Sequence, residues 1–188
     1  MNKKGLLIVY AGPSGVGKGT IMKEMLASDE NLKLSVSATT RSKRENEVEG
    51  VDYYYISDEA FDKMIENNEF LEHAEYCGHK YGTPKKPVFD MMHKGIDVIL
   101  EIEVEGYKQI KQMFPDCVSI FILPPSRDDL LNRLRNRGTE SKEDIEKRVS
   151  QAEYELSQAN KFDYKVINED VKSSTYEILS IIHDIKNK

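Results

Sequence analysis

The sequence predicts an α/β fold with a parallel central sheet. Short apolar runs rich in Ile and Val occur at Leu6–Ala11, Val98–Ile102 and Val118–Leu123, and each is followed by a turn and a helical pattern. Tyr164–Ile167 predicts a further strand. Strands that alternate with helices form parallel sheets, which bind ligands at the carboxyl ends of their strands. The residues that follow these runs are therefore the first candidates for a functional site.

Three helices are expected from the residues that would cap their first turns. Ser126, Ser141 and Ser174 each stand three positions before an acidic residue, which is the spacing of a capping box. In that motif, the hydroxyl and the acidic side chain pair with N–H groups that the helix leaves without a partner. Helices are predicted to begin just after these serines.

Residues 35–95 break this alternation and predict a small mixed subdomain inserted into the core. A helix with an acidic start is expected near Asp58–Asn67. A second helix is expected after Thr83, with Pro84 at its first position and its end at Gly95. Short alternating segments predict strands at Leu34–Ser37, Tyr53–Ile56 and Phe70–Tyr76.

Length and charge restrict the possible functions. The chain has 188 residues, with 27 Lys and Arg against 33 Asp and Glu, so its formal net charge is −6 and it has room for one domain. Such an acidic chain is a poor coat for nucleic acid. We expect no nucleic-acid partner, and any polyanionic ligand must be bound by locally concentrated cations.

Neither a membrane span nor an export signal is expected. The longest apolar run, Leu6–Ala11, is far shorter than the roughly 20 residues that cross a bilayer, and a Gly-rich turn follows it at once. Cys77 and Cys117 are the only cysteines and have no CxxC spacing, which favours a reducing compartment without disulfides. We predict a cytoplasmic protein without a membrane partner.

A phosphate-binding loop is predicted directly after the first strand. The segment fits the G-x-x-x-x-G-K pattern and lies between a strand and a helix, as the motif requires. Glycines let consecutive N–H groups turn toward phosphate oxygens, the helix N-terminus adds partial positive charge, and Lys18 reaches the outer phosphates. The predicted phosphate-binding residues are Gly12, Pro13, Ser14, Gly15, Val16, Gly17, Lys18, Gly19 and Thr20.

The residue after Lys18 departs from the strict motif. Gly19 stands where a hydroxyl usually faces Mg²⁺, so the hydroxyl is displaced to Thr20. Thr20 is therefore the candidate contact for a phosphate or for the metal. The Gly-Lys-Gly-Thr form is similar to that of small nucleotide kinases and less typical of switch GTPases.

All the arginines lie in two windows of the sequence, although lysines are spread throughout. Arginine offers a planar fork that binds phosphate through two N–H groups, whereas lysine offers a point charge. Arg127 and Arg135 are expected on a solvated helix face. The candidates for phosphate binding are Arg41, Arg44, Arg133, Arg137 and Arg148.

Three acidic residues alternate at the end of an apolar strand. Glu101, Glu103 and Glu105 would point to one face at the ligand end of the sheet. Like charges there repel unless cations are near. Two interpretations remain open: a strand end that faces Mg²⁺, as in phosphoryl-transfer enzymes, or a merely exposed strand end.

Several motifs cover nearly the whole chain in the order in which guanylate kinases have them, and the sequence resembles that family. Together they are far more specific than the phosphate loop alone. They are GPSGVGKGT in the loop, SATTR at Ser37–Arg41, EGVDYYY at Glu49–Tyr55, FLEHAEY at Phe70–Tyr76, YGT at Tyr81–Thr83, DVILEIEVEG at Asp97–Gly106, SIFILPPS at Ser119–Ser126 and RGTES at Arg137–Ser141.

The resemblance implies an α/β P-loop fold of three layers, with a parallel central sheet, a GMP-binding insert and a helical lid. A single domain would cover residues 1–188. Its parts would be a core of residues 1–34, 96–126 and 160–188, the insert 35–95 and the lid 127–159.

The resemblance also implies the reaction, which is transfer of the γ-phosphoryl group of ATP to GMP, and to dGMP, with Mg²⁺ as cofactor. ATP would bind residues 12–20, and the catalytic residues would be Lys18, Arg41, Arg133, Arg137 and Arg148. The GMP phosphate would be held by Ser37, Arg41, Arg44, Tyr53 and Tyr81, and guanine would be read by Glu72 and Thr83. Glu103 stands where the family commonly has an Asp near GMP.

Three other functions share part of this pattern. A kinase for another monophosphate or a phosphorylated sugar would share the loop, but Glu72 and Thr83 favour guanine. A non-catalytic guanylate-kinase-like interaction domain would typically lack Lys18. A P-loop GTPase is suggested by the N-K-x-D sequence at residues 160–163, but here that sequence follows a helical pattern, Ser150–Ala159, and precedes a strand.

Overall fold

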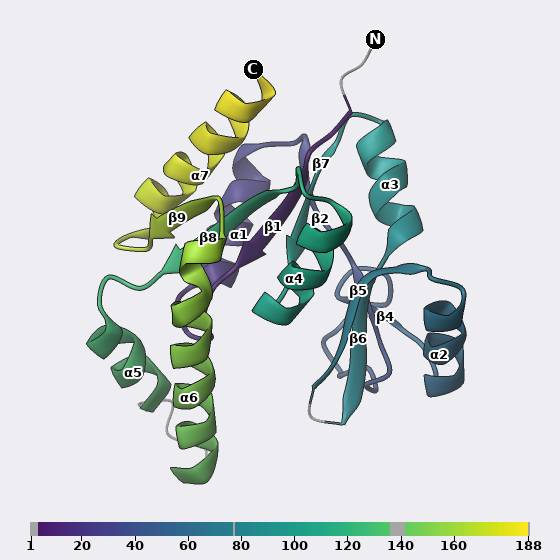
Figure 1. The fold of residues 1–188 in the computed structure, drawn as a ribbon, viewed down its shortest axis with the longest axis horizontal. Coiled ribbons are helices and arrows are strands. Elements are labelled where there is room, and N and C mark those ends of the chain that lie inside the picture. The colour runs from purple at the N-terminus through teal and green to yellow at the C-terminus, as the bar shows by residue number, and fades with distance from the viewer. Residues whose placement is uncertain (1–3, 77, 136–141, 188) are drawn as a thin grey trace. The chain divides into compact units, whose positions relative to one another are not determined.

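The computed structural model describes residues 4–76, 78–135 and 142–187 (Figure 1). The strands are β1 (Leu7–Ala11), β2 (Leu32–Leu34), β3 (Ser37–Thr39), β4 (Tyr53–Tyr55), β5 (Phe70–Tyr76), β6 (His79–Pro84), β7 (Asp97–Glu101), β8 (Val118–Leu123) and β9 (Tyr164–Ile167). The helices are α1 (Lys18–Ser28), α2 (Asp58–Glu66), α3 (Lys85–His93), α4 (Val104–Met113), α5 (Arg127–Arg135), α6 (Lys142–Gln158) and α7 (Val171–Lys186), with a short 3₁₀ helix at Ala159–Lys161.

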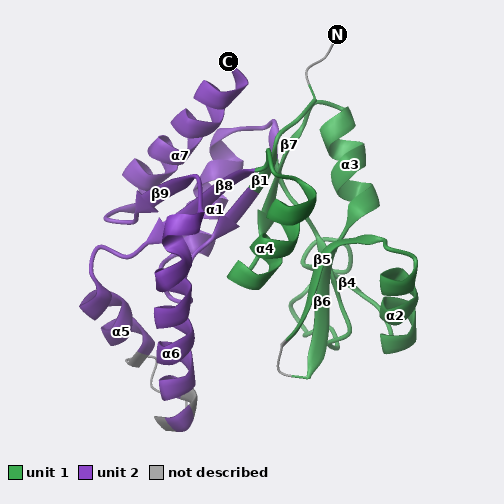
Figure 2. Ribbon diagram, in the orientation of Figure 1, with its two compact units in different colours: residues 1–8, 33–117 green, residues 9–32, 118–188 purple. Residues whose placement is uncertain are grey.

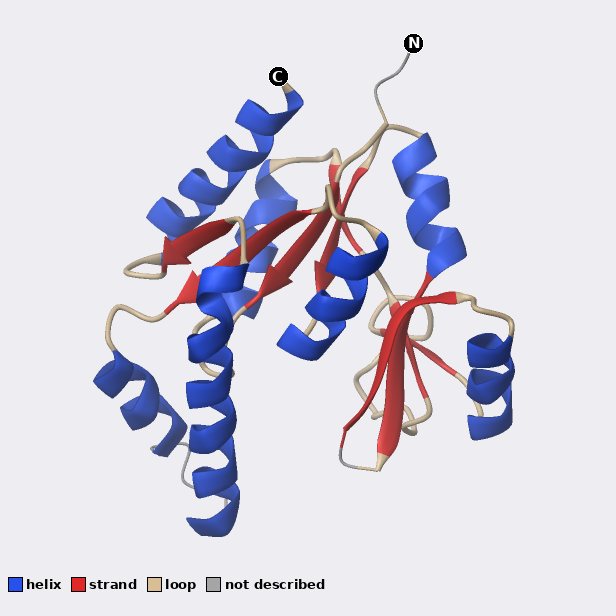
Figure 3. Cartoon of the chain, viewed as in Figure 1, coloured by secondary structure: helices blue, strands red, loops and turns tan. Residues whose placement is uncertain are grey.

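The strands form two sheets (Figure 3). The central sheet has the order β2-β7-β1-β8-β9, and β8 runs parallel to β9 with Ile120 opposite Tyr164. The second sheet has the order β4-β3-β6-β5. The α/β class and the parallel central sheet predicted from the sequence are confirmed.

The chain divides into two compact units (Figure 2). Unit 1 consists of residues 1–8 and 33–117, and unit 2 of residues 9–32 and 118–188. The phosphate loop belongs to unit 2, and the residues predicted to bind GMP belong to unit 1. Each unit is therefore described by itself.

In unit 1, the small sheet packs against α2 through an apolar cluster. Phe61 of α2 stacks on Phe70 of β5 with ring centres 4.4 Å apart, and both are buried with Ala38 of β3. The helix begins where Ser57 accepts a hydrogen bond from the Ala60 N–H, and acidic residues follow in its first turn. This buried cluster is the apolar contact between the sheet and α2.

In unit 2, α1 packs against α7, and α5 against α6. β8 is buried along most of its length, and the ring of Phe121 lies 4.9 Å from that of Phe162. Asp163 accepts hydrogen bonds from the backbone and the hydroxyl of Ser119, which tie the start of β9 to β8. These contacts fix β9 beside β8 in the central sheet.

Three sequence-based boundaries need correction. The helix predicted after Ser174 begins earlier, at Val171, because Asp170 accepts from two N–H groups of its first turn; Ser174 is instead buried within the helix. The strand predicted at Leu34–Ser37 is divided between β2 and β3. β6 was not predicted, since Gly82 and Pro84 interrupt its apolar pattern.

The predicted start of α5 agrees with the structure, whereas α3, expected to end at Gly95, ends at His93. The hydroxyl of Ser126 accepts from the Asp129 N–H, at 3.0 Å, before α5 begins. Pro84 directly precedes α3 rather than occupying its first position. Ser141 and the segment from Arg137 that carries the RGTES motif lie outside the described residues. No helix in the described ranges has the length and apolar character of a membrane span.

Candidate phosphate-transfer site

The phosphate loop, residues 12–20, connects β1 to α1. It turns at Gly15 and Gly17, whose φ angles of 84° and 100° lie in the left-handed region that glycine adopts without strain. α1 then begins at Lys18, with no acidic residue in its first turn to oppose the positive end of the helix. The loop therefore combines backbone N–H groups with a helix N-terminus, which is an arrangement suited to phosphate.

Lys18 folds back over the loop that precedes it. Its Nζ donates to the carbonyl oxygens of Gly12, at 2.6 Å, and Pro13, at 3.2 Å. These contacts hold the ammonium group against the loop, so its charge adds to that of the helix N-terminus. Thr20 lies in the first turn of α1 and is exposed.

Asn168 supports the phosphate loop from a distant part of the chain. This buried residue follows β9, and its Nδ2 donates to the Val16 carbonyl at 2.7 Å. A Cβ atom at position 17 would lie only 2.5 Å from that Nδ2. The conformation of the loop therefore depends on the Asn168 amide and on the absence of a side chain at Gly17.

Two helices of unit 2 contact the phosphate loop. Arg148 of α6 donates from Nη2 to the Ser14 hydroxyl at 3.0 Å. α5 approaches with its buried Leu134, because a Cβ atom at Gly15 would lie 3.3 Å from the Leu134 side chain. The structure thus brings Arg148 to the loop, as a phosphate-binding role requires.

The remaining arginines of these helices differ from one another. Arg133 is exposed on α5, whereas Arg137 lies outside the described residues. Arg127 is largely exposed, as predicted, and it forms an ion pair with Glu153 of α6 rather than with a neighbour on its own helix. That pair joins α5 to α6.

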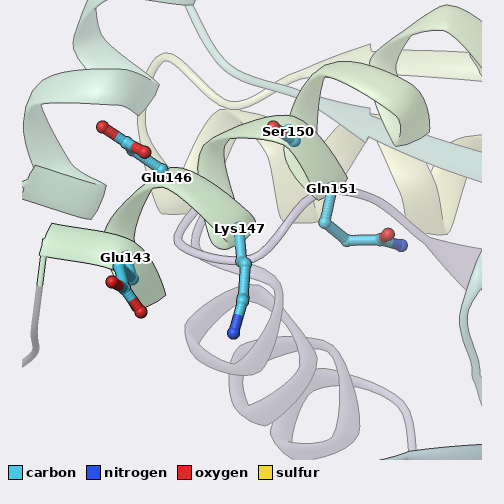
Figure 4. Close-up of a pocket in the computed structure, with 5 residues that line it drawn as sticks. All are labelled: Glu143, Glu146, Lys147, Ser150 and Gln151. Carbon is cyan, nitrogen blue, oxygen red and sulfur yellow. The ribbon is translucent and has the colours of Figure 1, made fainter.

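A hollow of about 540 Å³ lies beside α6 (Figure 4). Its described lining residues all come from this one helix, and they include two acids and one lysine. This mixed charge does not favour an anion, so the hollow is a weaker candidate for a phosphate site than the loop. The lining residues are Glu143, Glu146, Lys147, Ser150 and Gln151.

In unit 1, strand order brings four predicted residues together. β3 pairs with β4, placing Ser37 opposite Tyr53, and with β6, placing Thr39 opposite Tyr81. Arg41 follows β3 by two residues, and its guanidinium carbon lies 5.4 Å from the centre of the Tyr53 ring. Tyr81 contributes to the raised pKa of the same side chain, and its ring centre lies 5.9 Å from that of Tyr53. A cation and two phenols therefore meet at the end of β3.

Glu47 is not among the predicted residues, yet it makes the closest contacts with Arg41. Its Oε1 accepts from Nη2 at 2.7 Å and its Oε2 from Nη1 at 3.0 Å. These bonds, together with one from the Arg44 N–H, lower the pKa of Glu47 to about 2, and the pair raises the pKa of Arg41. The side chain of Arg44 is exposed.

Glu72 and Thr83 form a buried pair on neighbouring strands. The register of β5 and β6 sets them opposite each other, and the Thr83 hydroxyl donates to Glu72 Oε1 at 2.6 Å. Burial raises the pKa of Glu72, although the bond from Thr83 opposes the shift. A buried carboxylate that keeps capacity to accept hydrogen bonds is a recognition group for a ligand with N–H donors.

Gly106 of α4 makes room for the Glu72 carboxylate. A Cβ atom at position 106 would lie 2.8 Å from Glu72 Oε2, which is closer than real Cβ contacts allow. Glu103, at the N-cap of α4, is exposed, and its charge contributes to the raised pKa of Glu72. The first turn of α4 therefore shapes the surroundings of the carboxylate.

The raised pKa of Glu72 predicts a pH-dependent gain in stability from Glu72→Gln. A carboxyl group whose pKa is higher in the folded state stabilises the fold below its unfolded pKa, near 4.5, and this stability is lost as the pH rises through the folded value. At pH 7 the variant should therefore melt about 2–4 °C above the wild type. Melting curves at pH 4 should show a smaller difference; an equal gain at both pH values would contradict this account.

The three acids near the end of β7 do not share one face of a strand. Glu101 ends β7, Glu103 precedes α4 and Glu105 lies within α4, where it pairs with Lys108 at 2.7 Å. The strand was expected to continue to Ile102, but the chain turns into the helix instead. Of the residues that the structure describes, no three His, Cys, Asp or Glu side chains are grouped as metal ligands.

Some site residues could not be found from sequence patterns. Glu47 and Asn168 belong to none of the motifs found in the sequence, and Gly106 ends the DVILEIEVEG motif, which gives it no role of its own. Their contacts with Arg41, the phosphate loop and Glu72 are seen only in the three-dimensional structure. The predicted residues Lys18, Arg41, Glu72 and Thr83, by contrast, lie in motifs of the chain.

The parallel sheet and the loop between β1 and α1 define a P-loop kinase fold. Residues 4–185 match the family model described as guanylate kinase. The guanylate kinase of Clostridioides difficile (strain 630) is 54% identical over 186 residues, covering 99% of this chain and 91% of that protein. The guanylate kinase of Prochlorococcus marinus (strain MIT 9312) is 50% identical over 182 residues, covering 97% and 99%.

A solved structure agrees with these relatives. The crystal structure of guanylate kinase from Anaplasma phagocytophilum matches all of this chain and 89% of that one, with a TM-score of 0.79 and 34% sequence identity. This match confirms the predicted P-loop fold. The chain belongs to the guanylate kinase family.

Proposed function

We propose that the protein transfers the γ-phosphoryl group of ATP to GMP, and to dGMP, giving ADP and the nucleoside diphosphate. The observation that carries the proposal is the full-length family match in a chain that keeps both Lys18 in its loop and the buried Glu72. The first residue serves phosphoryl transfer in general, and the second selects the acceptor.

Unit 2 supplies the residues for ATP. The N–H groups of the phosphate loop and the Lys18 ammonium bind the phosphates, and Lys18 exchanges the loop carbonyls for phosphate oxygens. Mg²⁺ is usually held by one or two protein oxygens together with substrate phosphates. The exposed Thr20 hydroxyl could supply one such oxygen. When bound with ATP, the metal neutralises charge on the outer phosphates.

The transfer itself needs positioned cations more than a general base. An anionic oxygen of the GMP phosphate attacks the γ-phosphorus, and the bond to the oxygen that bridges the β- and γ-phosphorus atoms breaks, leaving ADP. Negative charge then spreads over the equatorial oxygens, where arginine N–H groups stabilise it. We assign this role to Arg133 and Arg148 of the lid segment, together with Arg41; Arg137 has the same assignment from its motif.

Unit 1 supplies the residues for GMP. Arg41, Arg44, Tyr53, Tyr81 and Ser37 are proposed to hold the phosphate at the end of β3. Guanine presents adjacent N1 and N2 donors, which a single carboxylate such as that of Glu72 can accept together, whereas adenine lacks the N1 proton. Thr83 orients that carboxylate, and Glu103 lies on the adjacent α4 as the counterpart of the family's usual Asp.

For the functional parts we propose the division that the resemblance implies. We propose residues 35–95 as the GMP-binding insert, 127–159 as the lid, and the remaining segments as the core. A reducing compartment, and hence the cytoplasm, remains a proposal that rests on the two isolated cysteines.

An acceptor panel tests the proposal. GMP, dGMP, AMP, CMP and UMP are offered separately with ATP and Mg²⁺, and the release of ADP is followed. We expect turnover with GMP and dGMP, and far less with AMP. No turnover with GMP above the acceptor-free blank, or equal use of AMP, would reject the assignment.

Asn168→Ala is expected to weaken ATP binding and the fold together. Its removal leaves the buried Val16 carbonyl without the amide, which costs about 1–3 kcal/mol of unfolding free energy. The KM for ATP should rise several-fold, while the KM for GMP changes little. Denaturant unfolding measures the loss of stability, and steady-state kinetics measures the change in KM. The matched control is Asn160→Ala, because Asn160 is exposed. If Asn168→Ala had the same stability and the same KM for ATP as this control, the supporting role of Asn168 would be refuted.

Gly106→Ala is expected to reduce selectivity for GMP. The new Cβ would displace the Glu72 carboxylate, although alanine favours the helix by about 1 kcal/mol over glycine. We expect the kcat/KM for GMP to fall about tenfold and that for AMP to stay nearly constant. In a Glu72→Ala background the same substitution should have little further effect; additive losses would show that Gly106 acts elsewhere.

A further inference from the structure

Glu47 is held by several groups besides Arg41. Its Oε2 accepts from the Tyr55 hydroxyl at 2.8 Å and from the Arg44 N–H at 2.8 Å, in addition to Arg41 Nη1. The side chains of Glu47 and Arg41 are only 17% and 14% exposed. The carboxylate therefore belongs to a closed network formed by the segment after β3 and by β4.

The network leaves one edge of the Arg41 fork for a ligand. Guanidinium has five N–H donors, and three of them go to the two Glu47 oxygens and to the Ser42 carbonyl. These three bonds use both donors of Nη1 and one of Nη2. The remaining donors, on Nε and Nη2, lie along the same edge of the planar group. That edge can take a phosphate in two parallel hydrogen bonds while Glu47 stays in place.

The aromatic rings limit how Arg41 can turn. Its guanidinium carbon lies 5.4 Å from the centre of the Tyr53 ring and 5.8 Å from that of Tyr55. The same Tyr55 donates to Glu47, so one residue restricts both members of the pair. If a phosphate expelled Glu47 from Arg41, the remaining partners of the carboxylate would still hold it close by. The carboxylate and the phosphate would then repel each other, and this repulsion opposes the exchange.

We propose that Glu47 is a positioning residue for Arg41, which it holds so that the Nε edge of the fork faces the phosphate of the acceptor nucleotide. The inference rests on the proposed function, because it takes GMP as the ligand of Arg41. Glu47 is thus a permanent partner of the arginine and does not compete with the substrate phosphate.

The test is Glu47→Gln, with Glu45→Gln as the control because Glu45 is an exposed residue of the same segment with the same charge. We expect the KM for GMP to rise about tenfold in Glu47→Gln, with the KM for ATP unchanged, because the lost interaction acts on one substrate only. Tyr55→Phe, which removes one bond to Oε2, should raise the KM for GMP about threefold and serves as the milder variant.

Calorimetric titration with GMP and with guanosine separates positioning from a general defect. Glu47→Gln should bind GMP about tenfold more weakly and guanosine as well as the wild type does, since guanosine has no phosphate for Arg41. A lower KM for GMP would identify Glu47 as a competitor, and an equal loss for guanosine would identify a structural defect; either result overturns the inference. Failure of the wild type to bind GMP would instead reject the proposed function.

Discussion

Lys18→Ala is expected to lower kcat/KM for GMP phosphorylation by about a thousandfold. The Nζ atom is held against the phosphate loop by the Gly12 and Pro13 carbonyls, so its charge lies where the outer phosphates of ATP are proposed to bind. Alanine removes that charge, and neutral N–H groups of the loop stabilise the transferring phosphoryl group less strongly. A coupled assay of ADP release with saturating ATP and varied GMP measures the loss.

The control for this substitution lies in the same helix. Lys23→Ala removes an exposed lysine of α1 and should leave kcat/KM within about twofold of the wild type, as surface changes usually do. Both variants should melt near the wild-type temperature. If Lys18→Ala kept a tenth or more of the wild-type rate, the proposed contact between this lysine and ATP would have to be abandoned.

Glu72→Ala is expected to abolish most of the preference for GMP over AMP. In the wild type, AMP leaves the buried carboxylate without N–H partners, and sites of this kind discriminate by about 10⁴. In the variant, GMP loses its two hydrogen bonds, so we expect its kcat/KM to fall at least about a hundredfold. AMP gains, because the variant no longer leaves a buried carboxylate without partners, so the ratio of the two kcat/KM values should fall by more than about a hundredfold.

Glu75→Ala is the matched control, because Glu75 lies on β5 but is exposed. It should keep the wild-type ratio of GMP to AMP. The same measurement decides the role of Glu72: a GMP preference that survives Glu72→Ala would place guanine recognition in other residues.

The sequence predicted those parts of the fold that depend on local patterns. β1 and β8 are mostly apolar, β9 is a short segment that ends in Val and Ile, and the cap of α5 is a serine three residues before Asp129, so each can be recognised within a short window. β6 could not be recognised in this way because it contains Gly82 and Pro84. It is held by pairing with its neighbour in the sequence, β5, and with β3, which is distant in sequence.

The same distinction applies to the candidate site. The phosphate loop and Lys18 follow from one continuous motif, and Arg41 from the grouping of the arginines; the resemblance to guanylate kinases gave Arg41 its place at the GMP phosphate and added Glu72. The partners of these residues depend on tertiary structure. Glu47 reaches Arg41 because the chain turns back between β3 and β4, and Gly106 meets Glu72 because α4 packs on β5.

The bond between Asn168 and Val16 has a consequence for biosynthesis. The two residues are separated by 152 positions, so the phosphate loop is made early but its support is made near the end of translation. At about 5–20 residues per second, the delay is roughly 8–30 s. During that interval the nascent chain has the motif without the amide that fixes its shape. The phosphate loop therefore gains this support only as synthesis of the chain nears completion.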